Sequence, residues 1–151
     1  MSLSQKCQYA LRALLELAVA YEADQGPVKI AAIAERQAIP PRFLEVILNQ
    51  LKQGGFVESR RGARGGYALV REPRSLSVGD VVRYVEGPIG PVSCVKSSRG
   101  SDCPLREECV FLPLWREVQR AVSKIYDGTS FAELAESWRH QRRSYVPNYV
   151  I

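Results

Sequence analysis

Three of the four cysteines lie near one another in a segment with little pattern of helix or strand. Eight residues separate Cys94 from Cys103, five separate Cys103 from Cys109, and glycine, proline, serine and charged residues surround them. Thiolates are soft donors that suit zinc, copper(I) and iron–sulfur clusters. This segment is therefore a candidate metal site.

The spacing of these cysteines argues against a structural zinc site. Such sites take four ligands, usually with two of them only a few residues apart, and neither gap here is that short. An iron–sulfur cluster is larger, and a loop can wrap it with wide and unequal gaps. On spacing alone, a bound cluster and three unliganded thiols are equally good interpretations.

A second group of residues with chemical potential is rich in arginine and glycine. Residues 60–66 read Arg-Arg-Gly-Ala-Arg-Gly-Gly. Glycines leave the backbone thin, so the guanidinium groups of Arg60, Arg61 and Arg64 are able to approach phosphates or a narrow minor groove. A solvated surface turn is the plain alternative. A phosphate-binding loop is disfavoured because no Gly-Lys-Ser/Thr follows the glycines.

The elements around these arginines predict a winged helix-turn-helix. Apolar spacing predicts three helices, over residues 3–21, 30–37 and 40–53. Two strand-like runs, 56–59 and 67–70, then predict a β-hairpin with the arginines at its tip. The fold class is therefore mainly α with a small β-hairpin, and we expect a DNA-binding domain over residues 1–86, ending in a helix that Ser77 and Asp80 cap.

The third helix has the composition of a helix that reads base edges in a major groove. Its expected core stripe consists of Leu44, Ile47, Leu48 and Leu51. Its opposite face carries polar side chains of suitable reach, namely Arg42, Glu45, Asn49 and Gln53. We therefore expect DNA contacts from Arg42, Glu45 and Asn49, together with the three wing arginines.

A long helix over residues 111–126 carries the pattern of a coiled coil. Apolar residues recur at intervals of four, three, four and three, at Phe111, Trp115, Val118, Val122 and Ile125. This seam predicts a homodimer. The chain then divides into a DNA-binding domain (1–86), a cysteine-containing cluster loop (87–110), and a dimerisation helix with a C-terminal helix and tail (111–151).

Composition and charge narrow the class of protein. The net charge is +5, and residues 1–75 hold 11 Lys and Arg against 7 Asp and Glu, which suits a polyanionic partner. The N-terminal apolar stretch contains Arg12 and Glu16, so we expect no secretory signal, no membrane partner and a cytoplasmic location. Structural disulfides are then not expected. An enzyme is not expected either, because His140 is the single histidine and no nucleophile–base pair is visible.

Several stretches resemble the Rrf2 family of bacterial transcription regulators. They are residues 3–4, 9–14, 43–45 and above all 61–69, which read Arg-Gly-Ala-Arg-Gly-Gly-Tyr-Ala-Leu. The resemblance implies a dimeric winged-helix regulator. It also implies that Glu45 corresponds to a base-discriminating residue of the recognition helix and Arg61 to a wing arginine that contacts DNA.

The resemblance also bears on the cysteines, because cluster-binding members of that family carry three cysteines between the same two helices. It therefore implies an iron–sulfur cluster on Cys94, Cys103 and Cys109, with a 2Fe–2S cluster preferred to a 4Fe–4S cluster. Some relatives add a histidine three residues after the last cysteine, where this chain has Leu112. Others take the fourth ligand from the partner subunit at the position of Gln8, which is a poor iron ligand. Cys7 beside it is the other candidate for a ligand from the partner subunit, and the alternative for Cys7 is a small buried hydrophobe.

The sequence thus predicts a homodimeric regulator that binds a pseudo-palindromic site in double-stranded DNA. Its DNA affinity is expected to respond to the cluster through a redox, iron or nitric-oxide signal. Two alternatives stay open. One is a cluster-free thiol-redox or cysteine-metabolism regulator of the same fold, and the other is an iron–sulfur electron carrier or assembly protein.

Overall fold

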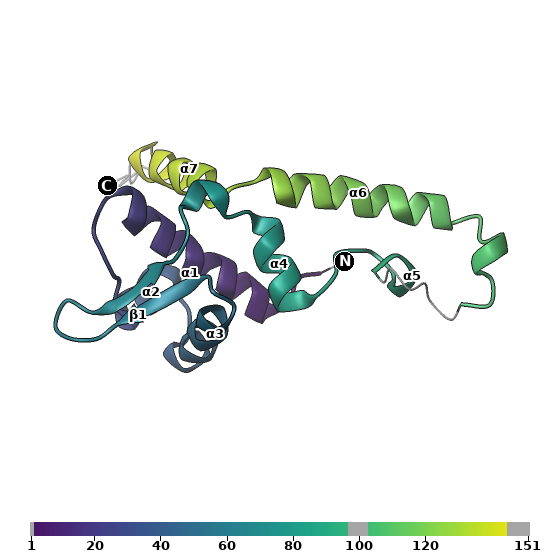
Figure 1. The fold of residues 1–151 in the computed structure, drawn as a ribbon. Helices are drawn as coiled ribbons and strands as arrows, with labels where there is room; N and C mark the ends of the chain where they lie inside the picture. The colour runs from purple at the N-terminus through teal and green to yellow at the C-terminus, as the bar shows by residue number, and fades with distance from the viewer. Residues whose placement is uncertain (1, 97–102, 145–151) are drawn as a thin grey trace, which may run out of the picture.

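The computed structural model describes residues 2–96 and 103–144, which form helices and one two-stranded antiparallel sheet (Figure 1). Helix α1 (Gln5–Glu22) runs through the middle of the domain. It begins at Ser4, whose hydroxyl accepts a hydrogen bond of 3.1 Å from the backbone N–H of Cys7. This bond satisfies one of the N–H groups that a helix start leaves unpaired. Ser4 is therefore the N-cap of α1.

Helices α2 (Ile30–Gln37) and α3 (Pro41–Gln53) follow, joined by a tight turn. Ala38 ends α2 in the left-handed region, with φ of 49°, and the backbone N–H of Ile39 bonds to the carbonyl of Ala34 at 2.9 Å. Pro41 starts α3, where the missing N–H of proline costs no hydrogen bond. Only three residues therefore separate α2 from α3, as in a helix-turn-helix.

The hairpin consists of β1 (Val57–Arg60) and β2 (Gly66–Leu69), with Val57 opposite Leu69. The connection before α2 joins it, because Val28 and Tyr67 exchange two backbone hydrogen bonds of 2.8 Å. Gly66 permits this contact. A Cβ at that position would lie 2.4 Å from the carbonyl oxygen of Val28, and the φ of Gly66 is +148°.

Helix α4 (Val78–Glu86) follows the short 3₁₀ helix η1 (Pro73–Ser75) and begins with the expected capping box. The Ser77 hydroxyl accepts from the N–H of Asp80, and the Asp80 carboxylate accepts from the N–H of Ser77, both at 3.1 Å. The next segment, expected to be a loop, also contains two short helices, α5 (Ser93–Lys96) and η2 (Arg106–Glu108).

Helices α6 (Leu112–Gly128) and α7 (Phe131–Ser144) complete the described chain. In Figure 1, α6 runs from right to left above α4, and α7 continues to the left, where it packs along α1. The expected C-terminal helix is α7, which runs to Ser144 and is followed by the expected tail. Residues 145–151 of that tail lie outside the described part.

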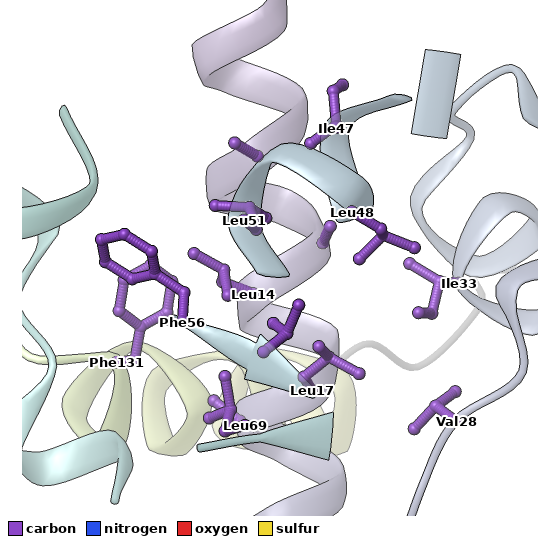
Figure 2. Packing of buried hydrophobic residues seen from close by; sticks show 14 of the residues in the cluster. Leu14, Leu17, Val28, Ile33, Ile47, Leu48, Leu51, Phe56, Leu69 and Phe131 are labelled. Carbon is purple, nitrogen blue, oxygen red and sulfur yellow. The ribbon is translucent and has the colours of Figure 1, made fainter. Parts of the chain in front are cut away.

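The main core lies between α1, α2, α3, the hairpin and α7 (Figure 2). Its largest buried side chains include Leu14, Leu44, Leu48 and Phe131. Each such side chain contributes about 1.5–3 kcal/mol when fully buried. Because Phe131 belongs to this cluster, α7 shares one core with residues 1–86. None of the helices in the described residues is long and apolar enough to cross a membrane.

Candidate DNA interface and cysteine loop

The face of α3 that points away from the core holds the side chains expected to read DNA. Arg42, Glu45 and Asn49 are all exposed. The opposite face is closed by the four predicted core residues, Leu44, Ile47, Leu48 and Leu51, all of which are buried. In Figure 1, α3 and the hairpin lie on the lower side of the domain, away from α6 and α7. Both expected reading elements are therefore available to one ligand.

A buried carboxylate fixes α2 against α1. Glu16 in α1 is only 2% exposed and accepts hydrogen bonds from Arg36 Nη1 at 2.8 Å and from Gln37 Nε2 at 3.0 Å. Arg12 in α1 adds a hydrogen bond to the backbone carbonyl of Gln37. A buried carboxylate left without these partners is costly. The orientation of the helix-turn-helix on α1 is therefore tightly specified.

The tip of the hairpin, which we call the wing, presents its arginines to solvent. Arg60, Arg61 and Arg64 are exposed, and Arg60 is engaged in an exposed ion pair with Glu58 at 2.9 Å. No ion pair of Arg61 or Arg64 is found among the described residues. Gly65 is required for the tight tip, since a Cβ there would lie 2.2 Å from the carbonyl oxygen of Arg60.

A hollow of about 690 Å³ lies beside the wing and adds a residue that the sequence pattern did not single out. Its charged lining residues are Asp24, Lys29, Arg60, Arg61 and Arg64. Lys29 stands directly before α2, which has no side-chain N-cap. A lone lysine in a turn carries little signal in sequence. Its position among the wing arginines makes it a candidate phosphate contact.

The cysteine segment is fastened to α6. Gln119 Nε2 donates to the carbonyl of Ile89 at 2.8 Å and to that of Val95 at 2.7 Å, on the two sides of Cys94. Arg106 Nη1 donates to the carbonyl of Cys94 at 3.1 Å and so joins the two arms of the segment. Residues 97–102, between those arms, lie outside the described part.

The three loop cysteines are accessible but do not form one group. Cys103 is exposed, and Cys94 and Cys109 are partly exposed. In the described ranges, no three side chains of the types His, Cys, Asp and Glu lie close enough to share a metal ion. The donor set itself suits an iron–sulfur cluster, because it supplies three soft thiol ligands on one segment. A fourth ligand beside these thiols is not found in the described part of the segment.

The two candidates for that fourth ligand differ in their surroundings. Cys7 is fully buried in a small cluster with Val82 and Ile89 of its own chain. Burial, and secondarily the negative charge of Glu86, raises the pKa of Cys7 to about 11. Gln8 is exposed, and its Nε2 donates to the carbonyl of Leu3 at 3.1 Å. Gln8 is therefore the accessible one of the two.

The residues of the expected dimer seam on α6 do not all have the same surroundings. Val122 packs against the small cluster of Cys7, Val82 and Ile89. Phe111, the residue before α6, and Ile125 near its end are exposed, while Trp115 and Val118 are partly exposed. The seam missed Leu114, which is also exposed. No residue of α6 is fully buried in the single chain.

An exposed ion pair links the far end of α6 to α4. Arg83 Nη2 lies 2.7 Å from Asp127 Oδ2. The hydrogen bond from Arg83 lowers the pKa of Asp127. Exposed pairs of this kind contribute little stability, at most about 1 kcal/mol. The ion pair of Asp127 and the hydrogen bonds of Gln119 thus connect α6 to α4 and to the cysteine segment.

Comparisons with known proteins identify the family to which this architecture belongs. A model of the Rrf2 family, described as iron-dependent transcriptional regulators, matches residues 3–137. The regulator CymR of Bacillus subtilis is 32% identical over 97% of this chain and 98% of its own. Its solved structure, described as that of a global cysteine regulator, has a TM-score of 0.75 over 91% of this chain and 98% of that chain.

Two proteins named IscR are also similar. IscR of Aliivibrio salmonicida is 36% identical over 89% of this chain and 77% of its own. The solved structure of T. potens IscR has a TM-score of 0.71 and 28% identity, over 99% of this chain and 95% of that chain. The curated relatives are named as helix-turn-helix transcriptional regulators. With its winged helix-turn-helix and a match from residue 3 to residue 137, the chain belongs to the Rrf2 family of transcription regulators.

Proposed function

We propose that this regulator binds DNA through α3 and the wing, and that an iron–sulfur cluster on Cys94, Cys103 and Cys109 sets its DNA affinity. The observation that carries the proposal is the position of the cysteines. Three accessible thiols lie on a segment hydrogen-bonded to α6, between the DNA-binding domain and the helix expected to dimerise. Membership of a family described as iron-dependent regulators supports it and favours a regulator over an electron carrier.

The three thiolates would hold the cluster, and we retain the preference for a 2Fe–2S type. When bound, the cluster would supply a centre that responds to oxidation, nitric oxide or iron supply. Gln8, exposed near the start of α1, is the better candidate for a fourth ligand from the partner subunit, because Cys7 is buried in its own chain.

The chain's own contacts provide a route from the cysteines to the dimer. Gln119 holds the carbonyls on both sides of Cys94, so a shift of the backbone there acts directly on α6. We propose that α6 pairs with its copy through Phe111, Val118 and Ile125, joined by Leu114. A dimer places two α3 helices on a pseudo-palindromic site. A change in the geometry of α6 would then change how well the two DNA-binding domains of the dimer fit the two half-sites at the same time.

Anaerobic purification with iron and sulfide analysis tests the cluster. The wild-type protein is expected to be brown and to contain iron and sulfide. Cys94→Ala, Cys103→Ala and Cys109→Ala are expected to lose both, because each removes a thiolate from a site without a spare. Cys7→Ala is the matched control, since it also removes a thiol and is expected to keep the visible spectrum. A full iron content in Cys103→Ala would overturn the cluster.

DNA binding by the same variants tests the coupling. The wild-type protein is expected to select a specific duplex, with an affinity that falls steeply with salt. Its affinity is expected to change on cluster loss and to match that of the cluster-free cysteine variants. Equal affinities of the cluster-loaded and cluster-free proteins would leave a DNA-binding regulator but refute cluster control.

A cluster-free cysteine regulator is the second candidate. The similarity to CymR over nearly the full length of both chains favours it, and so does the separation of the three thiols in the described residues. It predicts a colourless protein after anaerobic purification whose loop thiols react with oxidants and change DNA affinity. Iron and sulfide in stoichiometric amounts would exclude it.

A further inference from the structure

Val46 occupies the middle of the exposed face of α3, among the side chains expected to read DNA. It lies four residues after Arg42 and three before Asn49, so the three side chains project from the same side of the helix. The side chain of Val46 is 64% exposed. An exposed apolar side chain therefore lies between the polar side chains Arg42 and Asn49 on this face.

An apolar hollow continues this surface toward α1. Phe43, which is 63% exposed, stands beside Val46 on α3. The hollow has a volume of about 400 Å³ and is lined by Gln5, Lys6, Tyr9, Phe43, Val46 and Ile47. Lys6 is the one charged residue of this lining. A lining that combines one cation with apolar side chains suits a ligand that carries both anionic and apolar groups, as duplex DNA does.

The stability of the domain gives no reason for valine at this position. Valine is stiff at χ1 and is a poorer helix former than alanine, lysine or glutamine. Because Val46 is mostly exposed, it also contributes little to the core. A residue that lowers helix propensity and adds little packing, as Val46 does, is typical of a functional position.

We propose that Val46 contacts the C5-methyl group of a thymine in the major groove and so determines specificity at that base pair. The inference rests on the proposed DNA-binding function. Thymine is the one base that presents a methyl group in that groove. Against cytosine, adenine or guanine, valine would leave polar base atoms without a partner. Arg42 and Asn49 supply hydrogen bonds for the neighbouring base pairs.

Replacing thymine by deoxyuridine provides a direct test, because it removes the methyl group alone. The preferred site is first selected from a randomised duplex pool with the full-length wild-type protein. Each thymine of that site is then replaced singly. At one position in each half-site, the replacement is expected to weaken wild-type binding about 3- to 5-fold, the value of one buried methyl group. Val46→Ala is expected to bind the two duplexes equally.

A matched control separates this effect from a general loss of binding. Val70 follows β2, outside α3, and is 54% exposed, so Val70→Ala removes the same atoms elsewhere. It is expected to retain the thymine dependence of the wild-type protein. Val46→Ala is expected to fold normally, because alanine is the better helix former at an exposed site.

The outcomes distinguish this inference from the proposed function. Sequence-specific binding that no single thymine replacement weakens would overturn the role of Val46 and leave the regulator intact. Unchanged thymine dependence in Val46→Ala would do the same. Failure to select any specific duplex would overturn the DNA-binding function itself. Loss of the dimer in Val46→Glu, measured by light scattering, would assign this face to a second copy of the chain and overturn the thymine contact.

Discussion

The hydroxyl of Tyr84 donates a hydrogen bond of 2.7 Å to the backbone carbonyl of Gln50, in the last turn of α3. The Tyr84 ring also lies 5.0 Å from the ring of Phe56 and covers Gly54, where a Cβ would come within 2.5 Å of it. A single aromatic side chain of α4 therefore holds the end of the expected recognition helix. Since α4 leads directly into the cysteine segment, this contact connects the cysteine segment to the end of α3.

Tyr84→Phe tests that contact. The substitution removes the hydroxyl and keeps the ring, so we expect the free energy of unfolding to fall by about 0.5–1.5 kcal/mol. Urea unfolding measures it. Tyr9→Phe is the control, because the Tyr9 hydroxyl accepts a hydrogen bond from the side chain of Gln5 in the same helix and no other among the described residues, so a smaller change is expected. Equal losses in the two variants would contradict a special role of Tyr84.

The wing arginines should differ in their contribution to DNA binding. Arg61→Ala and Arg64→Ala are each expected to weaken binding and to reduce the salt slope of the affinity by about one unit, through loss of a phosphate contact. Arg60→Ala should have a smaller effect because Arg60 is paired with Glu58. Arg120→Ala on α6 removes the same charge far from the wing and serves as control. An unchanged slope in both Arg61→Ala and Arg64→Ala would remove the wing from the interface.

The dimer is best tested at Ile125, which is 65% exposed in the single chain. Ile125→Glu is expected to give monomers by light scattering, because it puts a charge in the proposed seam. Little loss of monomer stability is expected, because Ile125 is exposed in the single chain. Arg120→Ala changes the net charge equally and should remain dimeric. Val122→Glu is expected to destabilise the monomer as well, since Val122 packs against its own chain. A dimeric Ile125→Glu would place the interface elsewhere.

Cys7 should make stability depend on pH in the alkaline range. Its pKa is raised from 9.0 to about 11, so the folded state keeps a proton that the unfolded state releases. The stabilisation is complete below pH 9 and is lost as pH rises toward 11 and beyond. Between pH 8 and pH 11 the wild-type protein should therefore lose more unfolding free energy than Cys7→Ala does. Parallel pH profiles would refute the raised pKa.

Thiol labelling provides an independent check of the same burial. In the cluster-free native protein at pH 7.5, alkylating reagents are expected to modify Cys103 quickly and Cys7 only after unfolding, because thiolate character and access both control the rate. Mass spectrometry of the labelled peptides measures the order. Early labelling of Cys7 would show that it leaves its cluster in the native state.

Sequence pattern was sufficient for elements whose signals are local. The pair Ser77–Asp80 caps its helix as predicted, because a capping bond spans only three residues. The order of helices and hairpin is also confirmed. The hairpin was predicted with the arginine- and glycine-rich segment at its tip, and Gly65 and Gly66 there are close to backbone atoms that would exclude a side chain.

Features that depend on distant parts of the chain were not predictable in the same way. The 4-3-4-3 spacing describes which α6 residues are apolar, yet packing on α4 turns Val122 inward and leaves Leu114 outside. The docking of α7 on α1 depends on the burial of Phe131, which the local sequence pattern of that helix does not reveal. Lys29 and Val46 became candidates only when the structure showed their neighbours. The cluster and DNA contacts themselves stay predictions.

The backbone bonds between Val28 and Tyr67 have a consequence for operator architecture. Because peptide groups join the connection before α2 to β2, the helix-turn-helix and the wing meet a half-site as one rigid body. In the proposed dimer, only the distance between these two rigid bodies and their relative rotation can then change. A signal at the cysteines would then change how many base pairs are tolerated between half-sites, while the sequence preferred within each half-site stays the same. Spacer length is thus the property of a promoter on which such a signal would act.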